Sequence, residues 1–382
     1  MFTKQELLRY SRQILLPDLK LEGQQKLKQS SVLVIGAGGL GAPALYYLTA
    51  AGVGRIGILD FDTVDVSNLQ RQILYNSNDI GLLKTVKARE RLETLNPNVK
   101  IELHQCILNA ENAMGILANY DIVIDGSDNL PTRYLVNDAC VLLKKTLIYG
   151  AIFQFEGQVS VFNELLTDGN RGPNYRDLFP QPPPPEMVPS CSEGGVIGVL
   201  AGIIGSMQAS EAIKVLTGIG RTLSGRLMLF DSLDFTTRFL NIKCNSDNPV
   251  SGNKPSIHKL IDYQEFCNPT HSKEDYSVKE IMPTEVKKLL DEGIAFQIID
   301  VRESLEFGLV NIGGLNIPLK SVEEKATLIQ RNIPVVVLCK SGGRSHVAIE
   351  KLQQHHGFTN LLNLKGGILR WIDDVDQELM RY

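Results

Sequence analysis

The chain has 382 residues, of which 43% are hydrophobic and 21% charged, and this length predicts about two to three packed domains. Its formal net charge of −4 gives no basic surface for nucleic acid, so we expect no nucleic-acid partner. Six cysteines without paired spacing and an N-terminal stretch without a hydrophobic signal core predict a cytoplasmic protein rather than a disulfide-linked secreted one.

A glycine-rich junction follows the first expected strand. Residues 32–35 are apolar and β-branched, which is typical of a buried parallel strand, and residues 42–51 predict a helix. The turn between them contains Gly36, Gly38, Gly39 and Gly41. Such a turn lets the backbone approach a phosphate, and the N-terminus of the helix attracts the anion. A second strand, residues 56–59, ends at Asp60, where a Rossmann-like fold expects a carboxylate on ribose hydroxyls.

Two cations follow this carboxylate. Arg71 lies just after Asn68, and Lys84 comes shortly afterwards. The glycine turn alone is commonest in NAD- or flavin-dependent oxidoreductases. A nucleoside triphosphate that develops charge on its leaving group needs more positive charge than a dinucleotide does, so the ordered set favours ATP. Taken singly, either cation would be interpreted as a solvated surface charge.

An acidic residue marks the end of a further strand. Residues 121–125 predict a buried strand that brings Asp128 to the carboxyl edge of the sheet, where open α/β sheets bind ligands. A carboxylate there can hold magnesium against phosphates. The alternative is an Asx turn or a helix cap, because Asp128 precedes the run 129–131.

These residues resemble the MoeB/ThiF/HesA family, the bacterial relatives of ubiquitin-activating enzymes. The resemblance covers roughly residues 1–245 and rests on residues 9–14, 36–41, 60–62, 67–72, Lys84 and 127–129. It implies ATP-dependent adenylation of the C-terminal Gly-Gly carboxylate of a ubiquitin-like sulfur-carrier protein. Under the same resemblance, Asp60 binds the ribose, Asn68, Arg71 and Lys84 bind the phosphates, and Asp128 binds magnesium. Arg12 reaches the nucleotide of a neighbouring subunit, which implies a homodimer.

A proline-rich segment, residues 180–185, precedes Cys191. Such a segment cannot join a helix or a central strand, so we expect Cys191 on a mobile crossover loop. Residues 196–216 predict a buried helix, and a thiol just ahead of it is biased toward thiolate; the alternative is an inert small hydrophobe. The sequence around Cys191 resembles the loop that bears a reactive cysteine in ThiF-like and eukaryotic sulfur-carrier-activating members. The apolar run 196–209 is too short and glycine-rich to span a bilayer, so no membrane is expected.

One departure from the family concerns zinc. Many relatives carry two Cys-x-x-Cys pairs that bind a structural zinc ion, and the corresponding positions here are Asn174, Asp177, Asn248 and Ser251. Without thiolates there is no credible tetrahedral site. We therefore expect no zinc.

The composition changes at about residue 243. The expected domains are an adenylyltransferase domain at residues 1–245, a linker rich in Asn, Ser, Pro and Asp at 246–274, and a second domain at 275–382. In the second domain, residues 296–301 and 333–338 predict strands, and residues 284–290 and 345–356 predict helices. This alternation indicates a small α/β domain with a parallel sheet.

Cys339 follows an expected strand and begins a loop that opens a helix. Successive backbone N–H groups and the helix dipole would surround its sulfur and favour an anionic thiolate or persulfide, and Arg344 would add positive charge. The alternative is a buried structural cysteine, which glycines and an arginine make less suitable.

This region resembles a rhodanese domain, which implies sulfane-sulfur transfer through a cysteine persulfide. The resemblance covers roughly residues 275–382 and includes residues 300–303, 312–319, 339–345 and 366–371. A protein phosphatase also cradles a thiolate, but its loop is longer than the four residues that separate Cys339 from Arg344. The smaller ring suits a sulfur atom better than a phosphate.

Together, the two halves predict one enzyme that adenylates a carrier and then converts its carboxylate to a thiocarboxylate. Cys191 would be a relay, either as an acyl intermediate or as the thiol that reduces the disulfide left on Cys339. The sulfur donor is thiosulfate or a cysteine desulfurase, and the pathway stays open between molybdopterin, thiamine, tRNA thiolation and cysteine biosynthesis. Two alternatives from other classes are a NAD-dependent oxidoreductase with an accessory domain and a non-catalytic carrier-docking scaffold.

Overall fold

The computed structural model describes residues 2–183, 195–267 and 278–381. The chain divides into two compact units, Met1–Pro269 and Thr270–Tyr382, each of which is described by itself. Cys191 lies outside the described residues.

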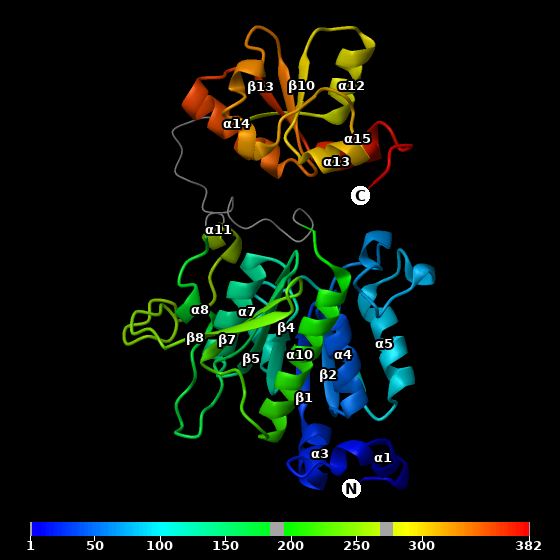
Figure 1. Cartoon of the computed structure of the whole chain (residues 1–382), viewed down its shortest axis with the longest axis vertical. Helices are drawn as coiled ribbons and strands as arrows, with labels where there is room; N and C mark the ends of the chain where they lie inside the picture. The colour runs from blue at the N-terminus through cyan, green and yellow to red at the C-terminus, as the bar shows by residue number, and fades with distance from the viewer. Residues whose placement is uncertain (1, 184–194, 268–277, 382) are drawn as a thin grey trace. The chain divides into compact units, whose positions relative to one another are not determined.

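The first unit is built on an eight-stranded sheet, counted over its described residues, with the order β3-β2-β1-β4-β5-β6-β7-β8 (Figure 1). The strands are β1 (Ser31–Ile35), β2 (Arg55–Leu59), β3 (Lys100–His104), β4 (Ile122–Asp125), β5 (Thr146–Phe153), β6 (Glu156–Phe162), β7 (Arg226–Asp231) and β8 (Thr236–Asn241). The first five strands run parallel to one another, and β6, β7 and β8 continue the sheet in antiparallel pairs.

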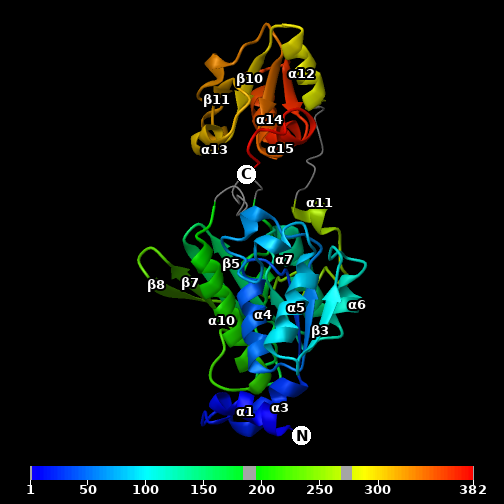
Figure 2. The same ribbon diagram turned by 90° about the vertical axis from the view of Figure 1, so that its right-hand side faces the viewer.

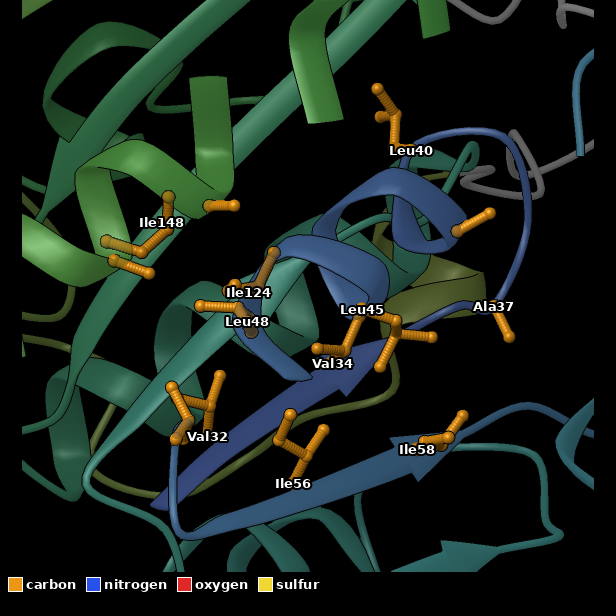
Figure 3. Close-up of a cluster of buried hydrophobic side chains, with 14 of the residues drawn as sticks. Val32, Val34, Ala37, Leu40, Leu45, Leu48, Ile56, Ile58, Ile124 and Ile148 are labelled. Atoms are coloured by element: carbon orange, nitrogen blue, oxygen red, sulfur yellow. The ribbon is translucent and has the colours of Figure 1, made fainter. Parts of the chain in front are cut away.

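Helices cover both faces of this sheet because the central strands are apolar at consecutive positions, which gives the sheet two apolar faces. On one face, Val32 and Val34 of β1 pack with Leu45 of α4 (Gly41–Ala51), Ala88 of α5 (Lys84–Leu95) and α10 (Gly198–Thr217); Figure 3 shows part of this core. On the other face, Leu33 of β1 belongs to a core that α6 (Ala113–Leu117), α7 (Leu130–Leu142), α8 (Tyr175–Leu178) and α11 (Tyr263–Cys267) complete.

Helices lie at the amino ends of the parallel strands, and loops lie at their carboxyl ends. At the amino ends lie α1 (Lys4–Arg9), α2 (Ser11–Ile14) and α3 (Lys20–Gln29) (Figures 1 and 2). The 3-10 turns η1 (Val66–Asn68) and η2 (Ser77–Asp79) belong to the connection from β2 to α5. The carboxyl ends of β1, β2 and β4 are therefore left to the loops that follow them.

The helix α10 is longer than the apolar run 196–209 that the sequence indicates. Among the described residues, α10 is long and apolar enough to cross a membrane by length and composition alone. It packs against the sheet, where Leu200 and Ile204 are fully buried in the core.

The expected linker at residues 246–274 also differs from the structure. Residues 246–267 belong to the first unit, and Asn248, Val250 and Tyr263 are buried. The apolar and amide side chains that anchor this segment are irregularly spaced, so no helical or strand period signals them in the sequence.

The second unit has a five-stranded parallel sheet, counted over its described residues, with the order β11-β10-β12-β13-β9. Its strands are β9 (Lys279–Ile281), β10 (Gln297–Asp300), β11 (Leu315–Asn316), β12 (Val335–Leu338) and β13 (Leu361–Leu364). Its helices are α12 (Pro283–Asp291), α13 (Ser304–Leu309), α14 (Gly343–His356) and α15 (Gly367–Asp374), with 3-10 turns η4 (Leu319–Ser321) and η5 (Ala326–Leu328). The two units confirm the predicted fold class of a Rossmann-like domain followed by a small α/β domain.

Candidate functional sites

The glycine turn between β1 and α4 is as tight as the sequence predicts. Gly36 has a φ of +85°, and a Cβ atom on it would lie 2.9 Å from the carbonyl oxygen of Gly126. A Cβ atom on Gly41 would lie 1.8 Å from the carbonyl oxygen of Gly36, so only glycine fits at both positions. The turn therefore brings its backbone close to β4 and opens toward the carboxyl end of the sheet.

A cleft lies at this edge, where β1, β2 and β4 end. It encloses about 990 Å³ of empty space, part of which is open to solvent. Its lining includes most of the residues that the sequence predicts for a nucleotide site, namely Gly36, Gly38, Gly39, Asp60, Arg71, Lys84 and Asp128. Arg12, Asn68 and Gly41 do not line it, and Gly41 serves the packing of the turn instead.

Asp60 is a largely buried carboxylate at the end of β2. Its Oδ2 accepts a hydrogen bond from the Ala37 N–H at 2.8 Å, and its Oδ1 accepts one from the Asp62 N–H at 2.8 Å. Burial raises the pKa of the Asp60 carboxyl, and the positive charge of Lys84 acts in the opposite direction. Asp60 thus holds the glycine turn in place and keeps oxygen lone pairs for a ligand.

Lys84 begins α5, and its side chain is nearly buried. Its Nζ lies 3.0 Å from Oδ2 of Asp62, whose own side chain is half exposed. The sequence motif contains Asp62 but does not reveal this pairing, because the two residues come from different elements. The contact with Asp62 therefore fixes the position of the Lys84 ammonium group in the lining of the cleft.

Asn68 is the last residue of η1, and Arg71 lies in the turn that follows. Arg71 lines the cleft and donates through Nη1 to the Ser67 carbonyl oxygen at 2.9 Å. The Asn68 Oδ1 accepts a hydrogen bond from the Asp65 N–H at 3.2 Å, and its carbonyl oxygen accepts from the Arg71 N–H at 3.1 Å. In this structure Asn68 shapes the turn that presents Arg71.

Asp128 lies exposed on the connection between β4 and α7 and lines the cleft. The helix cap is Asn129, whose Oδ1 accepts a hydrogen bond from the Thr132 N–H at 3.0 Å. The capping role that was the alternative for Asp128 therefore belongs to its neighbour.

A third cation of the cleft was missed by the sequence reasoning. Arg133 lies on the first turns of α7, lines the cleft and donates through Nη2 to the Ser127 carbonyl oxygen at 3.3 Å. The only sequence signal for it is its position one helical turn beyond the cap at Asn129.

Arg12 lies far from the cleft of its own chain. Its neighbour Gln13 donates a hydrogen bond to the carbonyl oxygen of Ala51, the last residue of α4, at 3.2 Å. Because the other end of α4 adjoins the cleft, the length of this helix, about 16 Å, separates the Gln13 contact from the cleft.

The four positions that correspond to zinc ligands in relatives do converge. The Asn174 Nδ2 donates to Ser251 Oγ at 2.8 Å, and the Asn248 Nδ2 donates to Asp177 Oδ1 at 2.7 Å and to Asn174 Oδ1 at 3.2 Å. Amide and hydroxyl groups that bond directly to one another do not fit a tetrahedral zinc ion. Within the described residues, no group of three or more His, Cys, Asp or Glu side chains could hold a metal ion.

The second candidate site is the loop after β12. Cys339 is 1% exposed, and its Sγ accepts hydrogen bonds from the Gly342 N–H at 3.1 Å and from Ser345 Oγ at 3.4 Å. A Cβ atom on Gly367 would lie 2.4 Å from the Cys339 carbonyl oxygen, so this glycine lets α15 approach the loop. The sequence predicts successive backbone N–H groups around the sulfur. The described contacts show one backbone N–H, that of Gly342, and the hydroxyl of Ser345, and Cys339 itself packs in the apolar core of the unit.

Arg344 has a partner that the sequence did not indicate. Its Nη1 and Nη2 donate to the two carboxylate oxygens of Glu306 on α13 at 2.7 and 2.9 Å. Both side chains are largely buried. The positive charge near the loop is therefore balanced within the unit, and Arg344 also ties the loop to α13.

The two units and their sites define a nucleotide-binding α/β domain joined to a cysteine-based transfer domain. Residues 10–251 match the ThiF family, and residues 282–374 match the rhodanese-like domain. The chain therefore belongs to the ThiF family and carries a rhodanese-like domain.

Curated relatives match the chain over all or part of its length. The chain is 43% identical to a probable adenylyltransferase/sulfurtransferase MoeZ of Mycobacterium tuberculosis over 100% of this chain and 96% of the relative. It is 42% identical to the adenylyltransferase and sulfurtransferase MOCS3 of Aedes aegypti, with coverage of 99% and 89%. A sulfur carrier protein adenylyltransferase of Thermus thermophilus is 54% identical over 70% of this chain and 98% of the relative. These relatives confirm the predicted class, an adenylyltransferase and sulfurtransferase.

Solved structures support the fold of the first unit. Escherichia coli MccB with ATP aligns with a TM-score of 0.54 at 20% identity, covering 61% of this chain and 70% of that one. PaaA aligns with a TM-score of 0.53 at 22% identity, with coverage of 63% and 75%. At these identities the likeness concerns the fold alone.

Proposed function

We propose that this enzyme uses ATP to adenylate the C-terminal Gly-Gly carboxylate of a ubiquitin-like sulfur carrier and then sulfurates it through a persulfide on Cys339. The observation that carries the proposal is the convergence of Arg71, Lys84 and Arg133 with Asp60 and Asp128 in one cleft at the end of the sheet. Three cations suit a triphosphate whose pyrophosphate leaves, and a hydride carrier has no use for them.

Within this cleft each group has a place in adenylation. Asp60 accepts hydrogen bonds from the ribose hydroxyls, and the apolar wall of Leu59, Ile107 and Leu108 packs against the base. Arg71 and Lys84 neutralise the phosphates as the carrier carboxylate attacks the α-phosphorus. A carboxylate is a poor electrophile, and the bond to AMP makes its carbonyl carbon open to attack.

Magnesium fits the donor set of the cleft. Bound magnesium supplies positive charge to the phosphate oxygens, and the exposed carboxylate of Asp128 is the ligand that the chain offers it. One carboxylate together with phosphate oxygens and waters is a common magnesium environment.

The second half-reaction begins at Cys339. Its thiolate attacks the outer sulfur of thiosulfate, so that a new S–S bond forms, the S–S bond of thiosulfate breaks, and sulfite leaves with the electron pair. The terminal sulfur of the persulfide then attacks the acyl adenylate, and AMP leaves. A second thiol cleaves the resulting acyl disulfide, which releases the thiocarboxylate and leaves a disulfide that an external dithiol reduces. A cysteine desulfurase would supply the same sulfur as its own persulfide.

Cys191 is the proposed second thiol, or else the site of a preceding acyl thioester. The Cys191→Ser variant separates the two roles. Accumulation of an acyl disulfide on Cys339 supports the reducing role, whereas loss of a hydroxylamine-sensitive thioester supports the acyl role.

A homodimer completes the nucleotide site in this proposal. Arg12 does not line the cleft of its own chain, and in this proposal it contacts the nucleotide bound by a second copy. Mixing Arg12→Ala protein with Arg71→Ala protein should restore part of the adenylation activity, because one shared site then regains both arginines.

The deciding experiment supplies the full-length protein with ATP, magnesium, thiosulfate, a dithiol reductant and a carrier that ends in Gly-Gly. The carrier should gain the mass difference between sulfur and oxygen, and labelled pyrophosphate should exchange into ATP. A carrier without its last glycine is the matched control. If neither signal arises with any carrier, the proposal fails. An NAD-dependent oxidoreductase would bind NAD without exchange, and a docking scaffold would tolerate both Arg71→Ala and Cys339→Ser.

Carriers of the molybdopterin, thiamine, tRNA-thiolation and cysteine pathways are the candidates to test. We propose that these reactions take place in the cytoplasm, which fractionation of the host tests directly.

A further inference from the structure

Gly342, Ser345 and Asn363 form a hydrogen-bond network beside the sulfur of Cys339. The sulfur accepts from the Gly342 N–H at 3.1 Å and lies 3.4 Å from Ser345 Oγ. Ser345 belongs to α14 and Asn363 to β13, and both side chains are buried. Neither side chain is therefore placed to touch an incoming sulfur donor.

Asn363 bonds to both of the residues that donate to the sulfur, Gly342 and Ser345. Its Nδ2 donates to the Gly342 carbonyl oxygen at 3.2 Å, and its Oδ1 accepts from Ser345 Oγ at 2.6 Å. Gly342 has a φ of +101°, a conformation that residues with side chains rarely adopt. The amide of Asn363 thus holds both the carbonyl group of this loop glycine and the hydroxyl of Ser345.

The hydroxyl of Ser345 has one hydrogen and several acceptors within reach. Asn363 Oδ1 is the nearest at 2.6 Å, the Gly342 carbonyl oxygen lies at 3.1 Å, and Cys339 Sγ lies at 3.4 Å. An ionised acceptor forms a stronger hydrogen bond than a neutral one. When Cys339 becomes a thiolate, the hydroxyl therefore gains by turning its hydrogen from Asn363 to the sulfur.

We propose that Ser345 is the side-chain donor that stabilises the Cys339 thiolate, and that Asn363 is a positioning residue for both Ser345 and the Gly342 N–H. The inference rests on the proposed role of Cys339 as the persulfide carrier. The thiolate forms before the sulfur is taken up, and it forms again when cyanide attacks the terminal sulfur and leaves as thiocyanate. The donors act in both steps, and they act on the reacting sulfur rather than on binding of the sulfur donor.

The main test is thiosulfate-to-cyanide sulfur transfer by the full-length protein. Ser345→Ala should lower kcat about tenfold, the effect of one hydrogen bond to a charged group, while KM for thiosulfate stays nearly constant. Ser345→Thr keeps the hydroxyl and should recover most of the rate. Asn363→Ala should lower kcat as well, and its effect should shrink in the Ser345→Ala background because the two residues act in one network.

Matched controls separate this role from a loss of folding. His346→Ala changes the next residue of α14, whose side chain is half exposed, and should leave both constants unchanged. Trp371 is the chain's single tryptophan and is buried in the second unit, so its fluorescence during urea unfolding reports on this unit. The inference is overturned if Ser345→Ala raises KM at constant kcat, or if Ser345→Thr is as slow as Ser345→Ala in a folded protein.

A second readout does not depend on sulfur transfer. Iodoacetamide should alkylate Cys339 about tenfold more slowly in Ser345→Ala than in the wild type, measured by mass spectrometry of the peptide that contains it. If the wild type takes no sulfur from any donor, the sulfurtransferase role fails, and the alkylation rates alone decide the role of Ser345. Equal alkylation rates in the two proteins would overturn that role.

Discussion

The nucleotide cleft and the Cys339 loop use the same backbone device for different tasks. In both, a parallel strand ends in a glycine-containing turn that opens a helix. The cleft is wide and presents three cationic side chains, whereas the loop closes around one atom with a backbone N–H and a hydroxyl. The site for a charged leaving group thus relies on positively charged side chains. The site for a single sulfur relies on N–H and O–H dipoles, because the charge of the nearby Arg344 is neutralised by Glu306.

The largest expected effect is a double dissociation between the two sites. Arg71→Ala should reduce pyrophosphate exchange by about a hundredfold to a thousandfold, because it removes a positive charge that stabilises the leaving pyrophosphate. It should leave thiosulfate-to-cyanide transfer intact. Cys339→Ser should abolish sulfur transfer to cyanide and preserve exchange. Measuring both reactions on both variants tests the comparison, which fails if either substitution disables both reactions in folded protein.

The ion pair between Arg344 and Glu306 gives the next largest effect. Glu306→Ala should lower the free energy of unfolding of the second unit by about 2 kcal/mol, because Arg344 loses a largely buried bidentate partner. Urea unfolding followed by Trp371 fluorescence measures this, with Glu324→Ala, which changes an exposed residue of the same unit, as the control. An unchanged midpoint would mean that Arg344 does not need Glu306.

The next prediction, with a smaller effect, concerns the hydrogen-bonded residues that occupy the positions of the zinc ligands in relatives. Elemental analysis should find no zinc, and a chelator should leave pyrophosphate exchange unchanged. Asn248→Ala should destabilise the first unit by about 1 to 3 kcal/mol, because it leaves buried polar partners unsatisfied. A variant with cysteine at positions 174, 177, 248 and 251 should gain one zinc ion per chain. One tightly bound zinc in the wild type would contradict this.

The sequence was most informative where the signal is local. Apolar runs that end in glycine, aspartate or, for β12, cysteine predict β1, β2, β4 and β12. The ordered motifs place Asp60, Arg71, Lys84 and Asp128, all of which line the cleft.

What the sequence could not show depends on contacts between distant segments. Glu306 and Arg344 are 38 residues apart, and Asp62 and Lys84 are 22 apart. The anchoring of residues 246–267 depends on irregularly spaced side chains such as Asn248 and Tyr263. Pairings of this kind leave no period in the chain, so only the folded structure reveals them.

The smallest expected effect compares two acidic strand ends. Asp300 ends β10 and accepts from the Arg302 guanidinium at 2.9 Å, whereas Asp125 ends β4 beneath the cleft and accepts from the Ser127 N–H at 2.9 Å. Burial raises the pKa of the Asp125 carboxyl, and Arg133 opposes this shift. A raised pKa in the folded state means that the folded protein holds its proton longer than the unfolded chain as the pH rises. Stability is therefore lost as the pH climbs from the ordinary value of 3.8 toward the raised one.

Asp125→Asn should remove this loss, since the amide keeps an acceptor for Ser127 and carries no charge. Its stability advantage over the wild type should grow as the pH rises above the ordinary carboxyl range and then level off. Urea unfolding of the first unit, followed by circular dichroism over a series of pH values, measures the difference. Asp300→Asn should instead lower the free energy of unfolding of the second unit, because there the lost charge is the partner of a buried arginine. If Asp125→Asn gains no stability over the wild type as the pH rises, the buried carboxylate of Asp125 does not carry this cost.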